Sequence, residues 1–472
     1  MAMNMLGRAF VLVVAMALTA CGGGSSSSSS GTGGGAGGVV VGGSGGSSSP
    51  DGNGSGGSDG SGTGGTGSGT GGAGTGDSGT GTGSSGDGSS GGTGAGSGGD
   101  SSASGPGDSG GVGSGGTGAS AASVAVGVAD GFGSVIMNGV RFNVDTAHVV
   151  TEDAMSLQLG MTASVRGVID AGMATGTATE ILSIPELRGL VSKIDVAAGL
   201  MEVMGVVVSV DEATAFAGVA ALSDLSVGAM VQVYALPNGP GRMRATRIEI
   251  STSGTHTRIR GAIQNLNTTA RTFRVEGLTV NYAAADFAGG LTSSALAEGM
   301  AVYVRASGSP SLGVLTATQL YRGHTLPTQS AAPVTLLGLV TDYVALRSFS
   351  LQGVPVDASA AQVTGGLATA IGNGVKLDVT GTMTNGVLVA SKVRIRNVPG
   401  TGGPVSFNVI GVVAQFKSAA NFRVNGQPIN ASGQGVAFVS GSAADLRNGV
   451  KVNIKGDHVV EGVLQATEVR FE

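Results

Sequence analysis

Four sequence landmarks recur five times in the same order along residues 123–472, and this periodicity constrains the fold more than any other feature. The first is a glycine within an apolar segment, and the second is a dipeptide that ends in glycine. The third is a glycine that opens an alternating segment, and the fourth is an Ala-Thr-like pair in the closing segment. The landmark residues are, in turn, Gly127, Gly189, Gly261, Gly338 and Gly411; Asn138-Gly139, Met204-Gly205, Glu276-Gly277, Gln352-Gly353 and Asn425-Gly426; Gly160, Gly228, Gly299, Gly374 and Gly449; and Ala178-Thr179, Ala245-Thr246, Ala317-Thr318, Ala390-Ser391 and Ala466-Thr467.

Alternation between apolar and polar residues predicts that the repeated segments are β-strands. In residues 450–454, for example, Lys451 and Asn453 alternate with three apolar residues, which is the period of a strand with one buried face. The dipeptides of the second landmark predict hairpin turns, because both central residues of such a turn have positive φ. Residues 220–225 and 442–446 break the alternation, and they predict a short helical turn between the third and fourth strands.

The resulting order, β-β-β-(short α)-β-β, is that of an OB-like five-stranded barrel. We therefore expect an all-β fold: a tandem array of five small OB-like β-barrels, each with a short helical turn. Closure into a barrel protects the edges of strands that are too short to be stable alone. The expected repeats span residues 121–185, 186–252, 253–323, 332–398 and 403–472.

The same landmarks carry a resemblance to a known family. The region from about residue 123 to the end resembles an uncharacterised repeat domain of bacterial exported lipoproteins, a domain of unknown function. The resemblance supports a small β-barrel fold. It supplies no active site that could be transferred to residues of this chain.

The N-terminus predicts a lipoprotein signal peptide over residues 1–20. Arg8 precedes an apolar run of about 10 residues, which is too short to span a bilayer but fits a signal peptide. The sequence Leu18-Thr19-Ala20-Cys21 resembles the lipobox of bacterial lipoproteins. That resemblance implies cleavage between Ala20 and Cys21, acylation of Cys21 and attachment to a membrane, and Gly22 favours the outer membrane. The alternatives are an ordinary secretory signal with an incidental cysteine and an uncleaved anchor.

Residues 21–120 consist almost entirely of Gly, Ser, Thr and Ala, so we expect a disordered tether. Its many Gly-x-Gly-x-x-Gly matches lack the flanking strand and helix of a phosphate-binding loop. Six of the 30 acidic residues lie in the tether and one of the 25 basic residues is Arg8, which leaves 24 of each for the repeats. A neutral region without a basic stripe argues against nucleic acid as a partner.

No constellation of residues predicts catalysis or a cofactor. The four histidines (His148, His256, His324 and His458) lack the spacing of metal ligands or of a catalytic triad, so we expect solvated strand-end or linker side chains and no metal. Carboxylates such as Asp378 and Glu468 alternate with apolar residues, which places them on an outward face.

Two pairs of arginines are the strongest candidates for binding an anion. Arg258 with Arg260, and Arg394 with Arg396, each place two cations on one side of a strand. They could hold an anionic glycan, but solvated edge charges are the favoured interpretation.

Aromatic residues are sparse, although OB-like barrels commonly bind their ligands by stacking on aromatic side chains. Four phenylalanines occupy the core pattern of the second strand: Phe142, Phe273, Phe349 and Phe422. Tyr234, Tyr303 and Tyr343 are the better candidates for exposure. The sequence identifies no ligand-binding residue.

We therefore expect a non-enzymatic envelope protein that presents its domains for binding or spacing, with an envelope glycan or protein as the possible partner. The alternatives are an enzyme or enzyme subunit with a site at a repeat interface, and a purely structural stalk.

The joints at 183–185 and 252–254 are short and those at 324–332 and 399–404 are longer, so the first two should be stiff and the later two should bend. Five domains in file would reach on the order of 130 Å and form an elongated particle.

Overall fold

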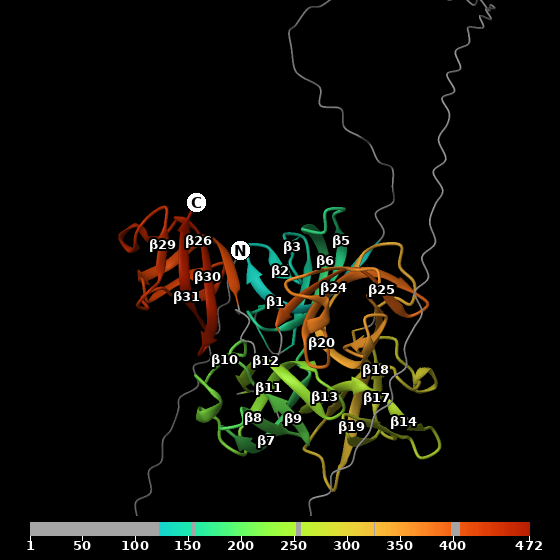
Figure 1. The fold of residues 1–472 in the computed structure, drawn as a ribbon. Coiled ribbons are helices and arrows are strands. Elements are labelled where there is room, and N and C mark those ends of the chain that lie inside the picture. The colour runs from blue at the N-terminus through green and yellow to red at the C-terminus, as the bar shows by residue number, and fades with distance from the viewer. Residues whose placement is uncertain (1–121, 153, 155, 252–255, 325, 398–405) are drawn as a thin grey trace, which may run out of the picture. The chain divides into compact units, whose positions relative to one another are not determined.

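The computed structural model describes residues 122–472, apart from residues 153, 155, 252–255, 325 and 398–405 (Figure 1). The signal peptide and the tether predicted for residues 1–20 and 21–120 lie outside this part of the chain. Within the described residues the structure is all-β, and its helices are single turns of 3-10 helix. None of these helices is long or apolar enough to cross a membrane.

The same order of elements recurs five times, as the sequence pattern predicts, and we number the repeats 1 to 5. Repeat 1 comprises β1 (Ser123–Phe132), β2 (Val135–Met137), β3 (Val140–Asn143), β4 (His148–Thr151), β5 (Thr162–Ile169) and β6 (Thr175–Ser183). Repeat 2 comprises β7 (Leu187–Asp195), β8 (Leu200–Val203), β9 (Val206–Ser209), β10 (Ala215–Ala217), η1 (Leu222–Asp224), β11 (Met230–Pro237) and β12 (Arg242–Ile250). Repeat 3 comprises β13 (Thr257–Ala262), β14 (Gln264–Asn267), β15 (Thr272–Val275), β16 (Leu278–Asn281), β17 (Asp286–Ala288), η2 (Ser293–Ala295), β18 (Ala301–Ala306) and β19 (Val314–Arg322).

The last two repeats follow the same plan. Repeat 4 comprises β20 (Val334–Ala345), β21 (Ser348–Leu351), β22 (Val354–Asp357), β23 (Gln362–Thr364), η3 (Ala368–Ala370), β24 (Lys376–Thr384) and β25 (Val387–Asn397). Repeat 5 comprises β26 (Phe407–Ser418), β27 (Asn421–Val424), β28 (Gln427–Asn430), β29 (Ala437–Val439), η4 (Ala443–Asp445), β30 (Lys451–Val460) and β31 (Val463–Phe471).

Main-chain pairing within a repeat leads from strand to strand and back to the first. In repeat 1, β1 pairs antiparallel with β2 and β5, and β2 pairs with β3. β3 then pairs in parallel with β6, which pairs antiparallel with β5. Repeats 2, 4 and 5 have the same pairings. In repeat 3 the first strand is divided into β13 and β14, which pair with β18 and β15 respectively.

Two local features differ from the predicted order. Each repeat contains a sixth, short strand after the third one, such as β4, which pairs in parallel with the last strand of its repeat. The predicted helical turn is a single 3-10 turn in repeats 2 to 5, and the described residues of repeat 1 contain no helix. These strands have three or four residues and lack the clear alternation from which the others were predicted.

The first and second landmarks are explained by one side-chain contact. The dipeptide forms a turn with two positive φ angles, for example 47° at Asn425 and 80° at Gly426. The side chain of its first residue then folds back over the first strand, where Nδ2 of Asn425 donates to the carbonyl of Ile410 at 2.5 Å. A β-carbon on Gly411 would lie 2.7 Å from Oδ1 of Asn425. The strand glycine therefore makes room for the turn residue.

The third and fourth landmarks also correspond to recurrent hydrogen bonds. The N–H of the third-landmark glycine donates to the first strand at 2.8–2.9 Å in all five repeats, as Gly374 does to Val340. In the fourth landmark, the hydroxyl donates to a carbonyl beside a register shift in the preceding strand. Thr246, for instance, donates to Tyr234 at 3.1 Å, where β11 shifts register against β12. The hydroxyl thus satisfies a carbonyl beside the bulge.

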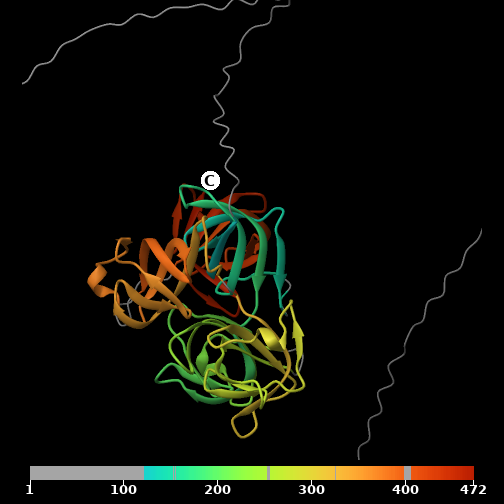
Figure 2. The same cartoon turned by 90° about the vertical axis from the view of Figure 1, so that its right-hand side faces the viewer.

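The prediction of domains in a row is wrong. All described residues fall within one compact unit, Ser109–Glu472, and β1 pairs in parallel with both β20 of repeat 4 and β26 of repeat 5. These pairings join repeats 1, 4 and 5 into one hydrogen-bonded sheet, and an antiparallel pairing of β7 with β13 joins repeats 2 and 3 into another (Figures 1 and 2). Main-chain groups at the strand edges of one repeat therefore form hydrogen bonds with strands of other repeats.

The hydrophobic core is divided along the same lines. Repeats 2 and 3 share one cluster of buried side chains, whereas repeats 1, 4 and 5 each form the main part of a separate cluster. Val126 of repeat 1 joins the cluster of repeat 4, and Leu159 of repeat 1 and Ala215 of repeat 2 join that of repeat 5. A small cluster of Val128, Leu236, Leu337 and Leu339 joins repeats 1, 2 and 4. The four phenylalanines predicted for the core are at most 3% exposed, which confirms that prediction.

Candidate functional site

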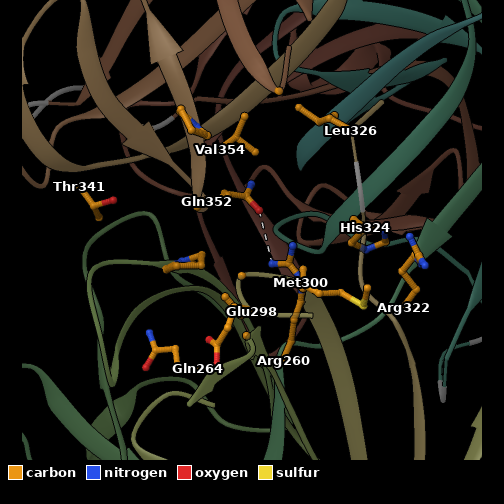
Figure 3. A pocket seen from close by; sticks show the side chains of 18 of the residues that line it. Arg260, Gln264, Glu298, Met300, Arg322, His324, Leu326, Thr341, Gln352 and Val354 are labelled. Atoms are coloured by element: carbon orange, nitrogen blue, oxygen red, sulfur yellow. Dashed lines mark hydrogen bonds between the residues drawn. The ribbon is translucent and has the colours of Figure 1, made fainter. Parts of the chain in front are cut away.

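A pocket of about 730 Å³ lies where repeats 2, 3 and 4 meet (Figure 3). Its walls come from the β11–β12 hairpin of repeat 2 and from β13 and the turns of repeat 3. Arg322, His324, residues 326–328, and the β21–β22 and β24–β25 turns of repeat 4 complete them. This volume is typical of small-molecule sites. Because three repeats build it, no single repeat of the sequence contains the site.

Arg260 is the buried cation of this pocket. Its side chain is 7% exposed, and its Nη1 lies 3.5 Å from Oε1 of Gln352 (Figure 3). The same Nη1 lies 3.9 Å from Oε1 of Glu186. Its guanidinium carbon lies 5.8 Å from the centre of the Tyr303 ring, which is a cation–π distance. The Nε atom of Arg260 is buried and has no hydrogen-bond partner.

Glu186 lies behind Arg260 and immediately follows the joint between repeats 1 and 2. The carboxylate accepts hydrogen bonds from the Thr162 hydroxyl at 2.8 and 3.0 Å and from the Ala235 N–H at 2.9 Å. Burial raises the pKa of Glu186, and the charge of Arg260 opposes that rise. Glu186 therefore contacts residues of repeats 1, 2 and 3. Its carboxylate oxygens already accept hydrogen bonds from Thr162 and Ala235, and Arg260 lies farther away.

His324 lines the pocket near Arg260, and the buried ring of Tyr303 packs against it. The two rings meet edge to face with their centres 5.8 Å apart. Burial and, to a smaller extent, the positive charge of Arg260 together lower the pKa of His324 to about 3, so the imidazole is neutral at pH 7. The Nε2 of His324 and the hydroxyl of Tyr303 are both buried without a hydrogen-bond partner.

Two residues of the second landmark, Glu276 and Gln352, line the same pocket. Gln352 keeps the contact typical of its position, because its Nε2 donates to the Leu337 carbonyl at 2.6 Å. Glu276 instead accepts from the N–H of Gly241 in repeat 2 at 2.9 Å. Burial raises the pKa of Glu276. Repeat 3 therefore has a carboxylate at the first position of the second landmark, where repeats 1, 4 and 5 have an amide side chain.

The interpretation of the arginine pairs as solvated edge charges is wrong for Arg258 and Arg260, which are buried, and only partly correct for Arg394 and Arg396, which are half-buried. Arg258 has a fully buried side chain and forms an ion pair with Glu152 of repeat 1, whose other oxygen accepts from Tyr321 at 3.4 Å. Arg396 pairs with Asp130 of repeat 1 at 2.5 Å. Arg258 and Arg260 are buried, and Arg396 is partly covered, because neighbouring repeats lie against the face that would be outward in an isolated domain.

Asp378 is likewise not on a solvated face. It is 5% exposed, and it pairs with Arg394 and with Arg396, whose Nη1 lies 3.5 Å away. Burial raises the pKa of Asp130 in the same cluster, against the lowering effect of Arg396. Glu468, the other carboxylate predicted to face outward, is half-buried and contacts Lys455 at 3.2 Å.

The predictions for the histidines and tyrosines are only partly correct. His148 and His458 are exposed, as expected, but His256 is 16% exposed and lies 3.2 Å from Nη1 of Arg188. Tyr234 and Tyr303 are fully buried, which contradicts their predicted exposure, and Tyr343 is half-buried. Among the described residues, no group of three or more His, Cys, Asp or Glu side chains could hold a metal ion. Ala20 and Cys21 lie outside the described part of the chain.

Comparison with known proteins identifies the repeat but not an activity. Residues 188–249, 260–320 and 410–470 match a family model described as a domain of unknown function (DUF5666). These three matches fall within repeats 2, 3 and 5, and they support the resemblance inferred from the landmarks. No curated protein matches the chain.

The sequence did not identify Arg260, His324, Glu276 and Gln352 as neighbours. One signal was present, because Glu276 replaces an amide or methionine at the second landmark. The Glu276 side chain contacts repeat 2 because of how the repeats pack against one another. The spacing of the landmarks in the sequence does not predict that packing.

Proposed function

We propose that this chain is a lipid-anchored, non-catalytic binding protein of the bacterial envelope. In this proposal five OB-like barrels assemble into one binding body, Cys21 carries the acyl anchor in the outer membrane, and residues 22–120 serve as the spacer. The partner is an envelope glycan or protein, and no cofactor is required.

The barrel interpretation is supported by the circuit of pairings in each repeat. The third and last strands pair in parallel while their neighbours pair antiparallel, and the 3-10 turn precedes the fourth long strand. An OB-like barrel has this order of strands.

The observation that carries the binding role is the pocket at the junction of repeats 2, 3 and 4. It combines half-buried apolar side chains with a few polar groups that converge on it, which is the usual composition of a binding site. The imidazole that could act as a general base is neutral but has its pKa lowered to about 3, far from the value that suits acid–base catalysis near neutrality.

The binding role is tested by capture of envelope glycans and proteins on the immobilised full chain. Val354 is half-buried on the pocket wall, so Val354→Trp should fill the pocket and abolish capture of a specific partner. Arg274 is exposed and outside the pocket, so Arg274→Gln is the matched control. Equal capture by all three chains would contradict the proposal.

The anchor is tested separately. The Leu-Thr-Ala-Cys sequence after the apolar run predicts that Cys21→Ser abolishes incorporation of labelled fatty acid and releases the chain from membranes. Unchanged labelling in that variant would contradict the lipoprotein assignment.

The cluster around Glu152 is the specific observation in favour of an enzyme with a site at a repeat interface. Glu152 of repeat 1 lies 3.9 Å from Nε2 of His256 and 3.4 Å from the hydroxyl of Tyr321, both in repeat 3. These groups could transfer protons if a substrate reached them. We favour a structural role, because the same carboxylate compensates the fully buried charge of Arg258.

A further inference from the structure

Arg260 has the weakest charge compensation among the buried arginines that form ion pairs. Arg258 is paired with Glu152, and Arg247 with Glu249 at 2.5 Å and with the Leu159 carbonyl at 3.0 Å. Arg260 has a 3.9 Å contact to Glu186, a 3.5 Å contact to Gln352 and the cation–π contact with Tyr303, but no carboxylate at hydrogen-bond distance among the described residues. A buried charge without close partners is costly, and such an arrangement suits a group that completes its hydrogen bonds with a ligand.

The protein itself cannot easily complete this pairing. Glu186 would have to give up hydrogen bonds from Thr162 and Ala235 in order to approach Arg260. Gln352 already donates its amide to Leu337. Arg260 is also part of the pocket wall, so a ligand in the pocket has access to the guanidinium. A planar guanidinium is well suited to a carboxylate, which it can hold through two parallel hydrogen bonds.

The charges of the pocket favour a singly charged anion. Arg322 contributes a second positive charge at the pocket wall, and Glu276 and Glu298 contribute two negative charges. Because the imidazole of His324 is neutral at pH 7, the lining carries no excess of positive charge. A dianionic phosphate would meet two carboxylates, whereas a carboxylate needs only one cation.

The rest of the lining suits an apolar body with amide groups. Met300, Leu326 and Val354 are half-buried apolar side chains on the wall (Figure 3), and the exposed side chain of Gln264 also lines the pocket. A peptide has this combination of an apolar side chain, hydrogen-bonding amides and a terminal carboxylate.

We propose that the pocket binds the C-terminal end of a peptide, with the terminal carboxylate held by Arg260 and the last side chain packed against Met300, Leu326 and Val354. The inference rests on the binding role proposed above and specifies its ligand class. Gln264 and Gln352 are placed to contact the peptide amides.

The proposal is tested by calorimetric titration of the full chain with N-acetylglycyl-leucine and with its C-terminal amide. The free acid should bind at least about tenfold more tightly than the amide, a factor worth about 1.4 kcal/mol. Arg260→Gln and Val354→Trp should each weaken binding of the free acid by at least about tenfold, and Arg274→Gln should leave it unchanged. Inorganic phosphate should not compete with the free acid.

Several outcomes would overturn the inference: equal binding of acid and amide, no binding of either, or effective competition by phosphate. If Arg260→Gln fails to fold, Val354→Trp and the comparison of acid with amide still decide the question. Specific capture of an envelope partner without any peptide binding would overturn only this inference. Absence of both peptide binding and specific capture of an envelope partner would overturn the proposed binding role as well.

Discussion

At the scale of single residues, close contacts explain why the landmarks recur. A side chain from each turn covers the glycine of the first strand, and in repeats 1, 4 and 5 its amide also donates to the residue before that glycine. This hydrogen bond ties the hairpin to the first strand. The pair of landmarks therefore reflects one packing requirement.

Gly411→Ala should destabilise repeat 5 by about 1–3 kcal/mol, because the added methyl displaces the Asn425 side chain and breaks its hydrogen bond. Hydrogen exchange of the β26 and β27 amides measures the local loss of protection. Adding Asn425→Gly should recover part of it. Gly433 is exposed, and a β-carbon there would meet nothing closer than 3.7 Å, so Gly433→Ala is a control that should stay within about 0.5 kcal/mol.

His324 should remain neutral down to about pH 3, which ring-proton shifts in an NMR titration can follow. Its folded pKa lies below the ordinary value of 6.5, so the unfolded chain binds more protons between these values. The contribution of His324 to the free energy of unfolding is therefore full above about pH 6.5 and falls as the pH decreases toward 3. His324→Asn should remove this dependence, and titration of the ring near 6.5 would contradict the prediction.

At the scale of elements, the hydroxyl of the fourth landmark stabilises a bulge in the strand before it. In all five repeats it donates to a carbonyl at the register shift, at 3.1–3.3 Å. The solvent exposure of this bond differs among the repeats. Thr246 is 5% exposed, whereas Thr467 is an exposed side chain.

Thr246→Val should cost about 1–3 kcal/mol, because it removes a buried hydrogen bond from the Thr246 hydroxyl to the carbonyl of Tyr234. Thr467→Val should cost no more than about 0.5 kcal/mol, since water can replace the hydroxyl at the Lys455 carbonyl. Exchange protection of the last two strands of each repeat measures the two effects. Equal losses would show that burial does not control the contribution of this hydrogen bond.

At the scale of the whole described region, buried ion pairs join repeats that are distant in sequence. Glu152 connects repeat 1 to repeat 3, and Asp130 connects repeat 1 to repeat 4. Such pairs add little net stability compared with apolar packing, but removing one partner is strongly destabilising. They therefore favour one arrangement of the repeats over others.

Glu152→Gln should weaken the contact between repeats 1 and 3 by about 3–5 kcal/mol, because it leaves the buried charge of Arg258 uncompensated. Increased exchange of β4, β13 and β19 together would report the loss. Glu180→Gln in the same repeat removes an exposed pair with Arg166 at 3.6 Å, and its effect should not exceed about 1 kcal/mol. A similar small effect for both variants would contradict a role of Glu152 in assembly.

The sequence by itself determined the all-β class, the repeated order of strands, the turns with positive φ and the phenylalanine core. These features depend on neighbours within one repeat, and a period of two residues or an X-Gly pair records them directly. Only the tertiary structure decided that Arg258, Arg260, Asp378, Tyr234 and Tyr303 are buried, and that Arg260 and His324 share a pocket. Alternation along a strand distinguishes its two faces, but it does not reveal whether water or another repeat covers the second face.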